Sequence, residues 1–248
     1  MSETLTHSPD PSETPARPAA GRPPAARSIV VVVTGGDALP DETAALLPAG
    51  AFVIAADSGI DHAARLGWRV DLAIGDFDSV TPAGLDAAAA AGARVERHPT
   101  AKDATDLELA LDAARARRPD EIVVVGGHGG RLDHLLAGLL VLAHDAYADI
   151  TMRAVTGAAR VYVVRSRVEL AAAPGSVVTL LAVGGPAHGV TTQGLRYPLV
   201  GETLIPGSTR GVSNLFVAPT ATVSVGSGVV LAIVPADPPP STLSPIHV

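Results

Sequence analysis

The order of apolar and polar positions divides the chain into two regions with different periods. Between residue 28 and about residue 157, short apolar runs alternate with segments of helical period. We expect strands at residues 29–33, 51–56, 71–74, 94–97, 121–125 and 150–155. Because these runs are continuous rather than alternating, they are typical of strands buried on both faces of a parallel sheet.

Helical patterns fill several of the intervals between these strands. Thr105, followed three residues later by Glu108, forms a capping box that predicts a helix start. Spacing typical of one helix face then follows at Leu107, Ala110, Leu111 and Ala114. A second helical face is predicted by leucines at positions 132, 135, 136, 139 and 140. Alternating strands and helices indicate a layered α/β domain with right-handed crossovers.

The helical period disappears from about residue 161. Short β-rich runs, separated by Gly and Pro, occupy residues 161–164, 177–183, 189–192, 216–218, 221–225 and 229–234. They predict a small antiparallel sandwich or barrel. The predicted fold is therefore an open, mostly parallel α/β sheet domain over residues 28–158, followed by an all-β domain over residues 159–235. We expect tails at residues 1–27 and at the Pro-rich residues 236–248, because neither segment has a hydrophobic period.

Composition excludes several classes of partner. A net charge of −7 and an aromatic content of 3% argue against a basic or base-stacking surface for nucleic acid. The absence of cysteine excludes disulfides and thiolate metal sites. Apolar runs such as residues 29–33 are far shorter than the roughly 20 residues that span a bilayer, and no apolar leader segment is visible. We expect a cytoplasmic protein that binds neither nucleic acid nor membrane.

The carboxylates carry most of the chemical information. Aspartates directly follow a predicted strand or begin the next helix at positions 37, 57, 76, 78, 103, 106 and 133. Ligands of open α/β sheets bind beyond the carboxyl ends of the strands, so several of these side chains are expected in one cleft. A single Asp after a strand is usually a cap or turn residue. Their repetition at equivalent fold positions favours a function.

Carboxylates that gather in one cleft repel one another unless a cation lies among them. Oxygen ligands without Cys suit Mg²⁺, which usually shares its coordination shell with phosphates. Lys102 and Arg131 are candidates to bind those phosphates, and His134 is another candidate contact. Gly35 and Gly36 allow an anion to approach the backbone closely. The chain has no P-loop motif and no Gly-x-Ser-x-Gly nucleophile motif.

Six short motifs resemble the thiamine pyrophosphokinase family. They occupy residues 56–59, 75–79, 102–108, 126–134, 194–199 and 211–214, in the order of the family. The most specific signal is Gly-Asp-Phe-Asp-Ser at residues 75–79 followed by Arg-x-Asp-His at residues 131–134. The chain departs from the family pattern at Ser58, where Gly is usual, at residues 179–182, and at Leu215, where a polar residue is common.

The resemblance implies a reaction, a cofactor and an assembly. The hydroxyl of thiamine would attack the β-phosphorus of ATP, giving thiamine diphosphate and AMP, with Mg²⁺ as cofactor. The resemblance also implies a homodimer whose site lies between the α/β domain of one subunit and the β domain of the other.

Residue roles follow from the same resemblance. Metal and phosphate chemistry is assigned to Asp76, Asp78, Asp103 and Asp133, with Asp57 as a further catalytic acid in the same cleft. Nucleotide binding is assigned to Ser79, Lys102, Asp106 and Arg131, and thiamine binding to Tyr197, Ser213 and Asn214. Gly35, Gly36 and His134, which are candidates from their chemistry and position, complete the predicted nucleotide site. Either Asp57 or Asp103 would accept the hydroxyl proton.

Two other functions remain open at this point. A pyrophosphokinase that acts on a hydroxymethyl-pterin would share the acidic cleft and differ in the acceptor pocket. A non-catalytic nucleotide-binding module would be expected to lack part of the acid set, whereas every acidic motif here is intact.

Overall fold

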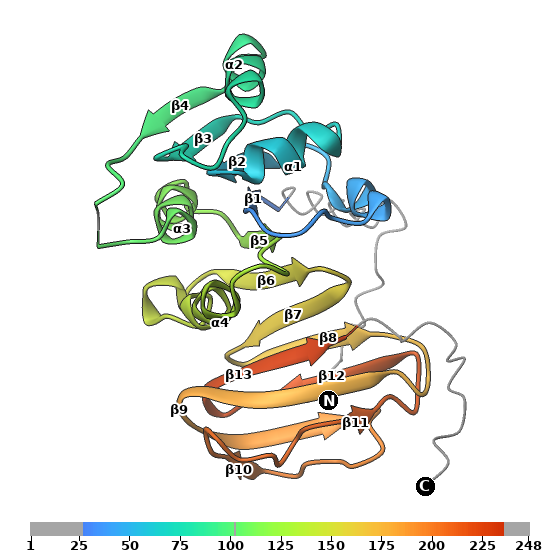
Figure 1. Ribbon diagram of the computed structural model, residues 1–248. Helices are drawn as coiled ribbons and strands as arrows, with labels where there is room; N and C mark the ends of the chain where they lie inside the picture. Colours follow the sequence, from blue (N-terminus) through green and yellow to red (C-terminus); the bar gives the residue numbers. More distant parts are fainter. Residues whose placement is uncertain (1–26, 102, 236–248) are drawn as a thin grey trace, which may run out of the picture.

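The computed structural model describes residues 27–101 and 103–235, so Lys102 and nearly all of the two expected tails lie outside the described residues. Strands and helices alternate in the first half of the chain (Figure 1). In chain order the elements there are β1 (Ile29–Val33), the 3-10 helix η1 (Asp41–Leu46), β2 (Phe52–Ala56), α1 (Gly59–Arg65), β3 (Leu72–Gly75), α2 (Pro82–Ala90), β4 (Arg94–Arg97), α3 (Asp106–Ala116), β5 (Glu121–Val125), α4 (Leu132–Val141), the 3-10 helix η2 (Asp145–Tyr147) and β6 (Thr151–Thr156).

The first six strands form a parallel sheet in the order β4-β3-β2-β1-β5-β6. Their bounds agree with the predicted runs to within one residue at each end, which confirms the α/β part of the predicted fold. Helices cover both faces of this sheet (Figure 1). On one face α3 packs its Ala110, Leu111 and Ala114 into a core with β1, β2 and β5. The other face packs against Ile60 and Ala63 of α1.

Strand β4 differs from the prediction of burial on both faces. Arg94 and Arg97 are exposed at its two ends, and Val95 and Glu96 are half-buried. The reason is its position at the edge of the sheet, where its one partner among the described strands is β3. Charged side chains on an edge strand oppose pairing with another chain.

Helix α4 forms where the leucine pattern predicts it, yet only part of its apolar face is covered. Leu139 and Val141 pack against the core beneath. Leu132, Leu136 and Leu140 are exposed to 77%, 57% and 48%. All ten residues of this helix are partly or fully exposed. An apolar stripe, defined by these three leucines, therefore faces outward.

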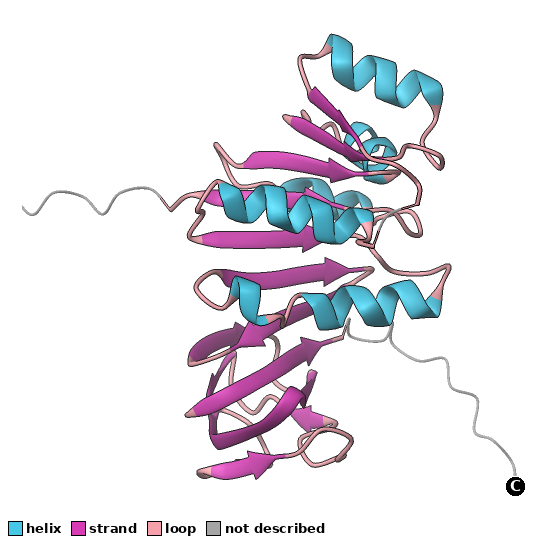
Figure 2. Cartoon of the chain, turned by 90° about the vertical axis from the view of Figure 1, so that its left-hand side faces the viewer, coloured by secondary structure: helices cyan, strands magenta, loops and turns pink. Residues whose placement is uncertain are grey.

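Antiparallel strands make up the second half of the described chain (Figure 2). They are β7 (Ala159–Val164), β8 (Arg167–Ala171), β9 (Val177–Gln193), β10 (Glu202–Leu204), β11 (Asn214–Leu215), β12 (Thr220–Ser224) and β13 (Ser227–Val234). Their arrangement agrees with the predicted antiparallel domain.

The individual strands of this half differ from the prediction in three places. Residues 177–183 and 189–192 were expected as two strands and form the single strand β9, which has a register shift opposite β13. The expected strand at 216–218 is the two-residue β11 followed by an isolated bridge from Phe216 to Leu195. Strands β8 and β10 were not predicted, because β8 mixes charged and apolar residues and β10 has only three residues.

The antiparallel strands continue the parallel sheet. Strand β7 pairs with β6 in a hairpin and with β13 on its other side, so the strand order runs β5-β6-β7-β13-β9-β12-β8. The expected boundary between residues 158 and 159 falls in the turn of this hairpin. Among residues 27–101 and 103–235, no helix has the length and apolar character needed to cross a membrane.

Candidate active site

Asp57 lies at the carboxyl end of β2, in a tight turn into α1. Its backbone is left-handed, with φ of 46°. The turn is tight because α1 begins directly against the end of β1, where a Cβ on Gly59 would collide with the Val33 carbonyl oxygen. Only glycine fits there. The turn is fixed further by the Asp57 N–H, which donates to the Ile74 carbonyl at 2.9 Å.

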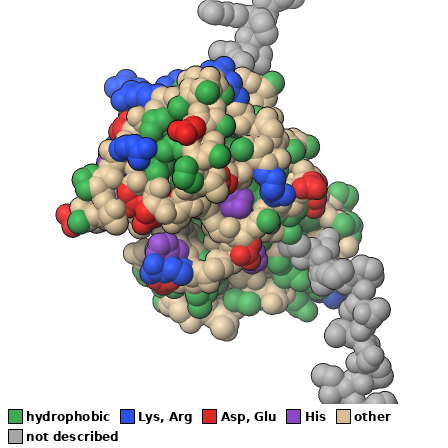
Figure 3. Space-filling model, turned by 45° about the horizontal axis from the view of Figure 1, so that its top comes forward, with side chains coloured by type: hydrophobic (Ala, Val, Ile, Leu, Met, Phe, Trp, Pro, Cys, Tyr) green, Lys and Arg blue, Asp and Glu red, His purple; other side chains and the backbone are tan. Residues whose placement is uncertain are grey.

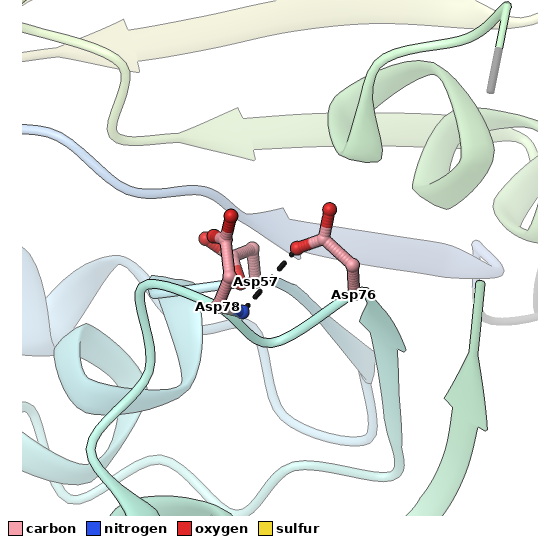
Figure 4. Close-up of side chains that lie close together, drawn as sticks. All are labelled: Asp57, Asp76 and Asp78. Atoms are coloured by element: carbon pink, nitrogen blue, oxygen red, sulfur yellow. Dashed lines mark hydrogen bonds between the residues drawn. The ribbon is translucent and has the colours of Figure 1, made fainter. Parts of the chain in front are cut away.

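Asp76 and Asp78 follow β3, the neighbour of β2. The backbone N–H of Asp78 donates to Oδ1 of Asp76 at 3.3 Å, and the Ser79 hydroxyl donates to Oδ1 of Asp78 at 2.9 Å. Between them, Phe77 is left-handed, with φ of 61°. Figure 4 shows that the side chains of Asp76 and Asp78 reach toward Asp57 from this loop.

These three carboxylates form a compact acidic cluster. One ligand oxygen from each of Asp57, Asp76 and Asp78 lies within 4.8 Å of the other two (Figure 4). Burial raises the pKa of Asp57, and the charges of Asp106, Asp76 and Asp78 raise it further, against a hydrogen bond from the Ser58 backbone. Oδ1 of Asp57 is buried and has no hydrogen-bond partner among the described residues. A divalent cation with oxygen ligands fits this donor set.

Asp106 begins α3 and lies beside the acidic cluster. A Cβ on Gly75 would lie 3.2 Å from Oδ1 of Asp106 and 3.3 Å from Cα of Asp57. The expected capping residue Thr105 holds this helix start, since its hydroxyl accepts from the Glu108 N–H at 3.2 Å. Asp103 is exposed and lies outside the cluster.

Arg131 and Asp133 pair with each other at the start of α4. Nη2 of Arg131 donates to Oδ2 of Asp133 at 2.6 Å, and this hydrogen bond lowers the pKa of Asp133 to about 2. Both side chains are largely exposed, and so is the neighbouring His134. Asp133 is not part of the acidic cluster formed by the described residues of one chain.

Gly35 and Gly36, predicted to bind the nucleotide, pack against the loop that contains Gly127 and His128. The N–H of Gly127 donates to the Gly35 carbonyl at 2.7 Å. A Cβ on Gly36, whose φ is 126°, would lie 2.5 Å from the His128 carbonyl oxygen. A Cβ on Gly35 would collide with the Ser58 hydroxyl, so Ser58, a departure from the family pattern, lies against this loop.

Arg97 is a cation near the cluster that sequence reasoning missed. Its guanidinium lies 5.1 Å from the centre of the Phe77 ring. Phe77 is the residue between Asp76 and Asp78 in the loop that follows β3. No motif contains Arg97, and only the pairing of β4 with β3 places it here. Figure 3 brings this end of the molecule forward and shows acidic, basic and histidine side chains mixed across it.

A hollow of about 380 Å³ lies in the antiparallel half of the chain. It is lined by Tyr197, Leu199, residues 208–212 and Asn214. Tyr197 is 54% exposed, so its ring is available to a ligand. Ser213 is not among the lining residues; its N–H donates to the Thr179 hydroxyl at 3.1 Å.

Asn214 holds Tyr197 in place. Asn214 is 2% exposed, and its amide donates to the Tyr197 carbonyl at 2.7 Å and accepts from the Tyr197 N–H at 3.0 Å. The sequence predicted that Asn214 lines the thiamine pocket. In the structure Asn214 borders the hollow and its amide also fixes the backbone of Tyr197.

Comparison with known protein families matches both halves of the chain. Residues 43–153 match the model described as thiamin pyrophosphokinase, catalytic domain, and residues 165–230 match thiamin pyrophosphokinase, vitamin B1 binding domain. The chain belongs to the thiamine pyrophosphokinase family. It is therefore an enzyme, a transferase of a family that forms thiamine diphosphate.

Individual members of the family resemble the chain in sequence and in fold. Thiamine pyrophosphokinase from Bacillus subtilis (strain 168) is 28% identical over 171 residues, which cover 65% of this chain and 76% of that protein. Thiamine pyrophosphokinase 1 from Oryza sativa subsp. japonica is 24% identical over 262 residues, covering 93% and 97% of the two chains. The crystal structure of the Bacillus subtilis enzyme superposes with a TM-score of 0.75 over 85% of this chain and 100% of its own, at 28% identity. The thiamin pyrophosphokinase family fold thus extends over both halves of the sheet.

Proposed function

We propose that the chain transfers the diphosphate group of ATP to the hydroxyl of thiamine, in a reaction that depends on Mg²⁺. The single observation that carries this proposal is the acidic cluster of Asp57, Asp76 and Asp78 at the carboxyl ends of β2 and β3. Phosphoryl transfer depends on positioning and on charge neutralisation, and needs no covalent nucleophile from the protein. The match to a vitamin B1 binding domain favours thiamine over a pterin as the acceptor.

The acidic cluster would hold the cation. A magnesium ion bound there would offset the charge of the ATP phosphates and of the departing AMP. Oδ1 of Asp57, which has no hydrogen-bond partner among residues 27–101 and 103–235, is the donor atom that a cation would satisfy best. Arg97 and Arg131 supply positive charge near the carboxyl ends of β3 and β5 for the remaining phosphate oxygens.

The thiamine hydroxyl oxygen attacks the β-phosphorus, the bond from that phosphorus to the α-phosphate oxygen breaks, and AMP leaves. The hydroxyl proton passes to a carboxylate. We assign this acceptor to Asp57 rather than to Asp103, because Asp103 is exposed and outside the cluster.

The acceptor would bind in the Tyr197 hollow. Thiamine has flat rings and a cationic thiazolium, which an aromatic face attracts. Asn214 hydrogen-bonds both the N–H and the carbonyl of Tyr197. These bonds fix the backbone position from which the exposed ring extends.

We infer that the enzyme is a homodimer with a site shared between subunits. Six strand spacings separate β2, which ends at Asp57, from β9, which precedes Tyr197. At about 4.8 Å each, they amount to roughly 30 Å along the sheet, too far for one thiamine molecule to bridge. A second copy would bring its own Tyr197 hollow to these acids. Exposed apolar side chains on both halves, the leucine stripe of α4 and Val200, Ile205 and Val217, are suited to such an interface.

The reaction is tested by incubating the full chain with ATP, MgCl₂ and thiamine, followed by chromatography of the products. We expect equal amounts of AMP and thiamine diphosphate, and none when EDTA replaces MgCl₂. A parallel incubation with 6-hydroxymethyl-dihydropterin is expected to give no AMP. AMP formation with the pterin only would favour the alternative acceptor. Nucleotide binding without AMP from either acceptor would indicate the non-catalytic module.

A further inference from the structure

A cavity of about 400 Å³ lies at the amino ends of the parallel strands, and the acidic cluster lies at their carboxyl ends. It opens at the amino ends of β5 and β6 and is closed by the end of β7 and the start of β8. The acids follow the carboxyl ends of the parallel strands, so the length of a strand such as β5, roughly 16 Å, separates the two places. Its volume falls within the range of about 300–1,000 Å³ found for small-molecule sites.

The charged lining of this cavity is predominantly basic. Four arginines, Arg27, Arg153, Arg165 and Arg167, line it together with two acids, Glu121 and Asp149, which leaves a formal excess of two positive charges. The whole chain, in contrast, has a net charge of −7. The cavity is therefore a local concentration of positive charge in an acidic protein, and it selects for anions.

Part of this charge is already neutralised, because Glu121 pairs with two of the arginines and Nη1 of Arg165 lies 3.4 Å from Oδ1 of Asp145, outside the lining. Glu121 is buried and accepts from Nε of Arg153 at 2.5 Å, while Arg27 lies 3.9 Å from its other oxygen. Within the described part of the chain, the hydrogen bonds of Arg167 are two long ones of 3.5 Å, to the hydroxyls of Ser224 and Thr222. Arg167 thus has no carboxylate partner among the described residues and keeps donor capacity for a ligand.

Arg165 is held rigidly in the wall. Its Nη2 donates to the carbonyls of Ala143 and His144 at 2.7 and 2.9 Å. Its Nε is buried and has no hydrogen-bond partner within the part of the chain that the structure describes. Tyr162, Val163 and Val168 add apolar surface to the same cavity. An arginine cluster beside an aromatic and aliphatic wall matches a ligand with an anionic end and an apolar body.

We propose that this arginine-lined cavity binds a small phosphorylated molecule with a flat or apolar body. The arginines meet the phosphate, because a guanidinium fork matches two phosphate oxygens, and the apolar wall packs against the body. The cavity is separate from the acidic cluster and from the Tyr197 hollow, so the proposal does not depend on the reaction proposed above.

Phenyl phosphate is a suitable probe. Phenol and inorganic phosphate are the control ligands, because one has only the apolar ring and the other only the anion. Isothermal titration calorimetry of the full chain is expected to give a Kd of about 0.1–1 mM for phenyl phosphate, at least about fivefold weaker binding for inorganic phosphate, and none for phenol. Arg167→Gln should weaken phenyl phosphate binding at least about fivefold. Arg94→Gln removes an arginine that is 78% exposed on the edge strand β4, and is expected to leave the Kd unchanged.

The variant Arg131→Gln distinguishes binding in this cavity from binding near the catalytic acids. If phenyl phosphate binding is lost in Arg131→Gln and retained in Arg167→Gln, the ligand binds near the catalytic acids and the proposal is wrong. Absence of binding to the unmodified chain, or equal binding by Arg94→Gln and Arg167→Gln, also overturns it. Arg27→Gln, which removes another guanidinium of the same cavity, gives a second variant if Arg167→Gln does not fold.

Discussion

Asp57 combines three features that each cost the folded state free energy. Its backbone is left-handed, its Oδ1 is buried without a partner among the described residues, and the carboxylates of Asp76 and Asp106 lie nearby. Such costs persist where the surrounding structure enforces them, and they concentrate at functional sites. The same features make Asp57 the residue whose neutralisation has the clearest physical consequence.

Asp57→Asn should stabilise the metal-free protein at neutral pH. Because folding raises the pKa of Asp57 above 3.8, the ionised carboxyl destabilises the fold above its folded-state pKa, and this penalty disappears as the pH falls toward 3.8. Asn also tolerates a positive φ. We expect the Tm in EDTA to rise by about 1–3 °C at pH 7, with a smaller gain at pH 4.5. An unchanged or lower Tm at pH 7 would contradict the destabilising role of this carboxyl.

Asp76→Asn and Asp78→Asn should each lower kcat by at least about a hundredfold, an electrostatic loss of about 3 kcal/mol, with the fold retained. The reason is that each change removes a charged ligand oxygen from the cluster. Steady-state kinetics with thiamine and circular dichroism test this. The matched control is Asp86→Asn, on the exposed surface of α2, which is expected to keep the unmodified rate. Near-normal kcat in either cluster variant would contradict the metal role.

At the scale of the elements, sequence prediction succeeded for strands that are buried on both faces and for a helix start that is capped locally. The parallel strands are continuous apolar runs because both faces are covered, and Thr105 is a real N-cap because its hydroxyl meets the Glu108 N–H. Prediction was incomplete where partners lie far along the chain. Strand β8 pairs with β12, whose partner residues follow 49 to 57 positions later in the chain. Strand β9 is a single strand because β13 pairs across its register shift. Neither pairing is visible in the local pattern.

The N-cap of α3 provides an element-scale test. Thr105→Ala should lower the free energy of unfolding by about 1 kcal/mol, since it removes the acceptor for the Glu108 N–H. Thr105→Ser keeps a hydroxyl and should lose much less. Urea unfolding followed by circular dichroism measures both. Equal losses for Ala and Ser would show that the hydroxyl does not cap the helix.

At the scale of the whole molecule, strand order explains which site residues the sequence could place. Asp57, Asp76 and Asp78 follow adjacent strands, so their prediction as neighbours is confirmed by geometry. Asp133 follows β5, which lies two strands from β2 with β1 between them. The sequence shows that each aspartate follows a strand, but it does not give the order of the strands, so it could not separate Asp133 from the cluster.

The exposed leucine stripe of α4 provides a test of the assembly. Leu136 is 57% exposed, so Leu136→Asp should leave the folded subunit intact and shift the protein from dimer to monomer. Size-exclusion chromatography with light scattering measures the mass. Ala87→Asp introduces the same charge on the exposed face of α2 and is expected to remain dimeric. A dimer that persists in Leu136→Asp would place the interface elsewhere.

The most direct test of the proposed shared site is complementation between two inactive variants. Tyr197→Ala removes the acceptor ring, and Asp78→Asn removes a cluster acid, so each homodimer should have little activity. After subunit exchange, half of the dimers are mixed and each contains one intact site of two, so we expect about a quarter of the unmodified activity. Mixing Asp76→Asn with Asp78→Asn, which damage the same half of the site, should restore none. If the Tyr197→Ala and Asp78→Asn mixture stays at the level of the separate variants, with exchange confirmed by native mass spectrometry, the site is not shared between subunits.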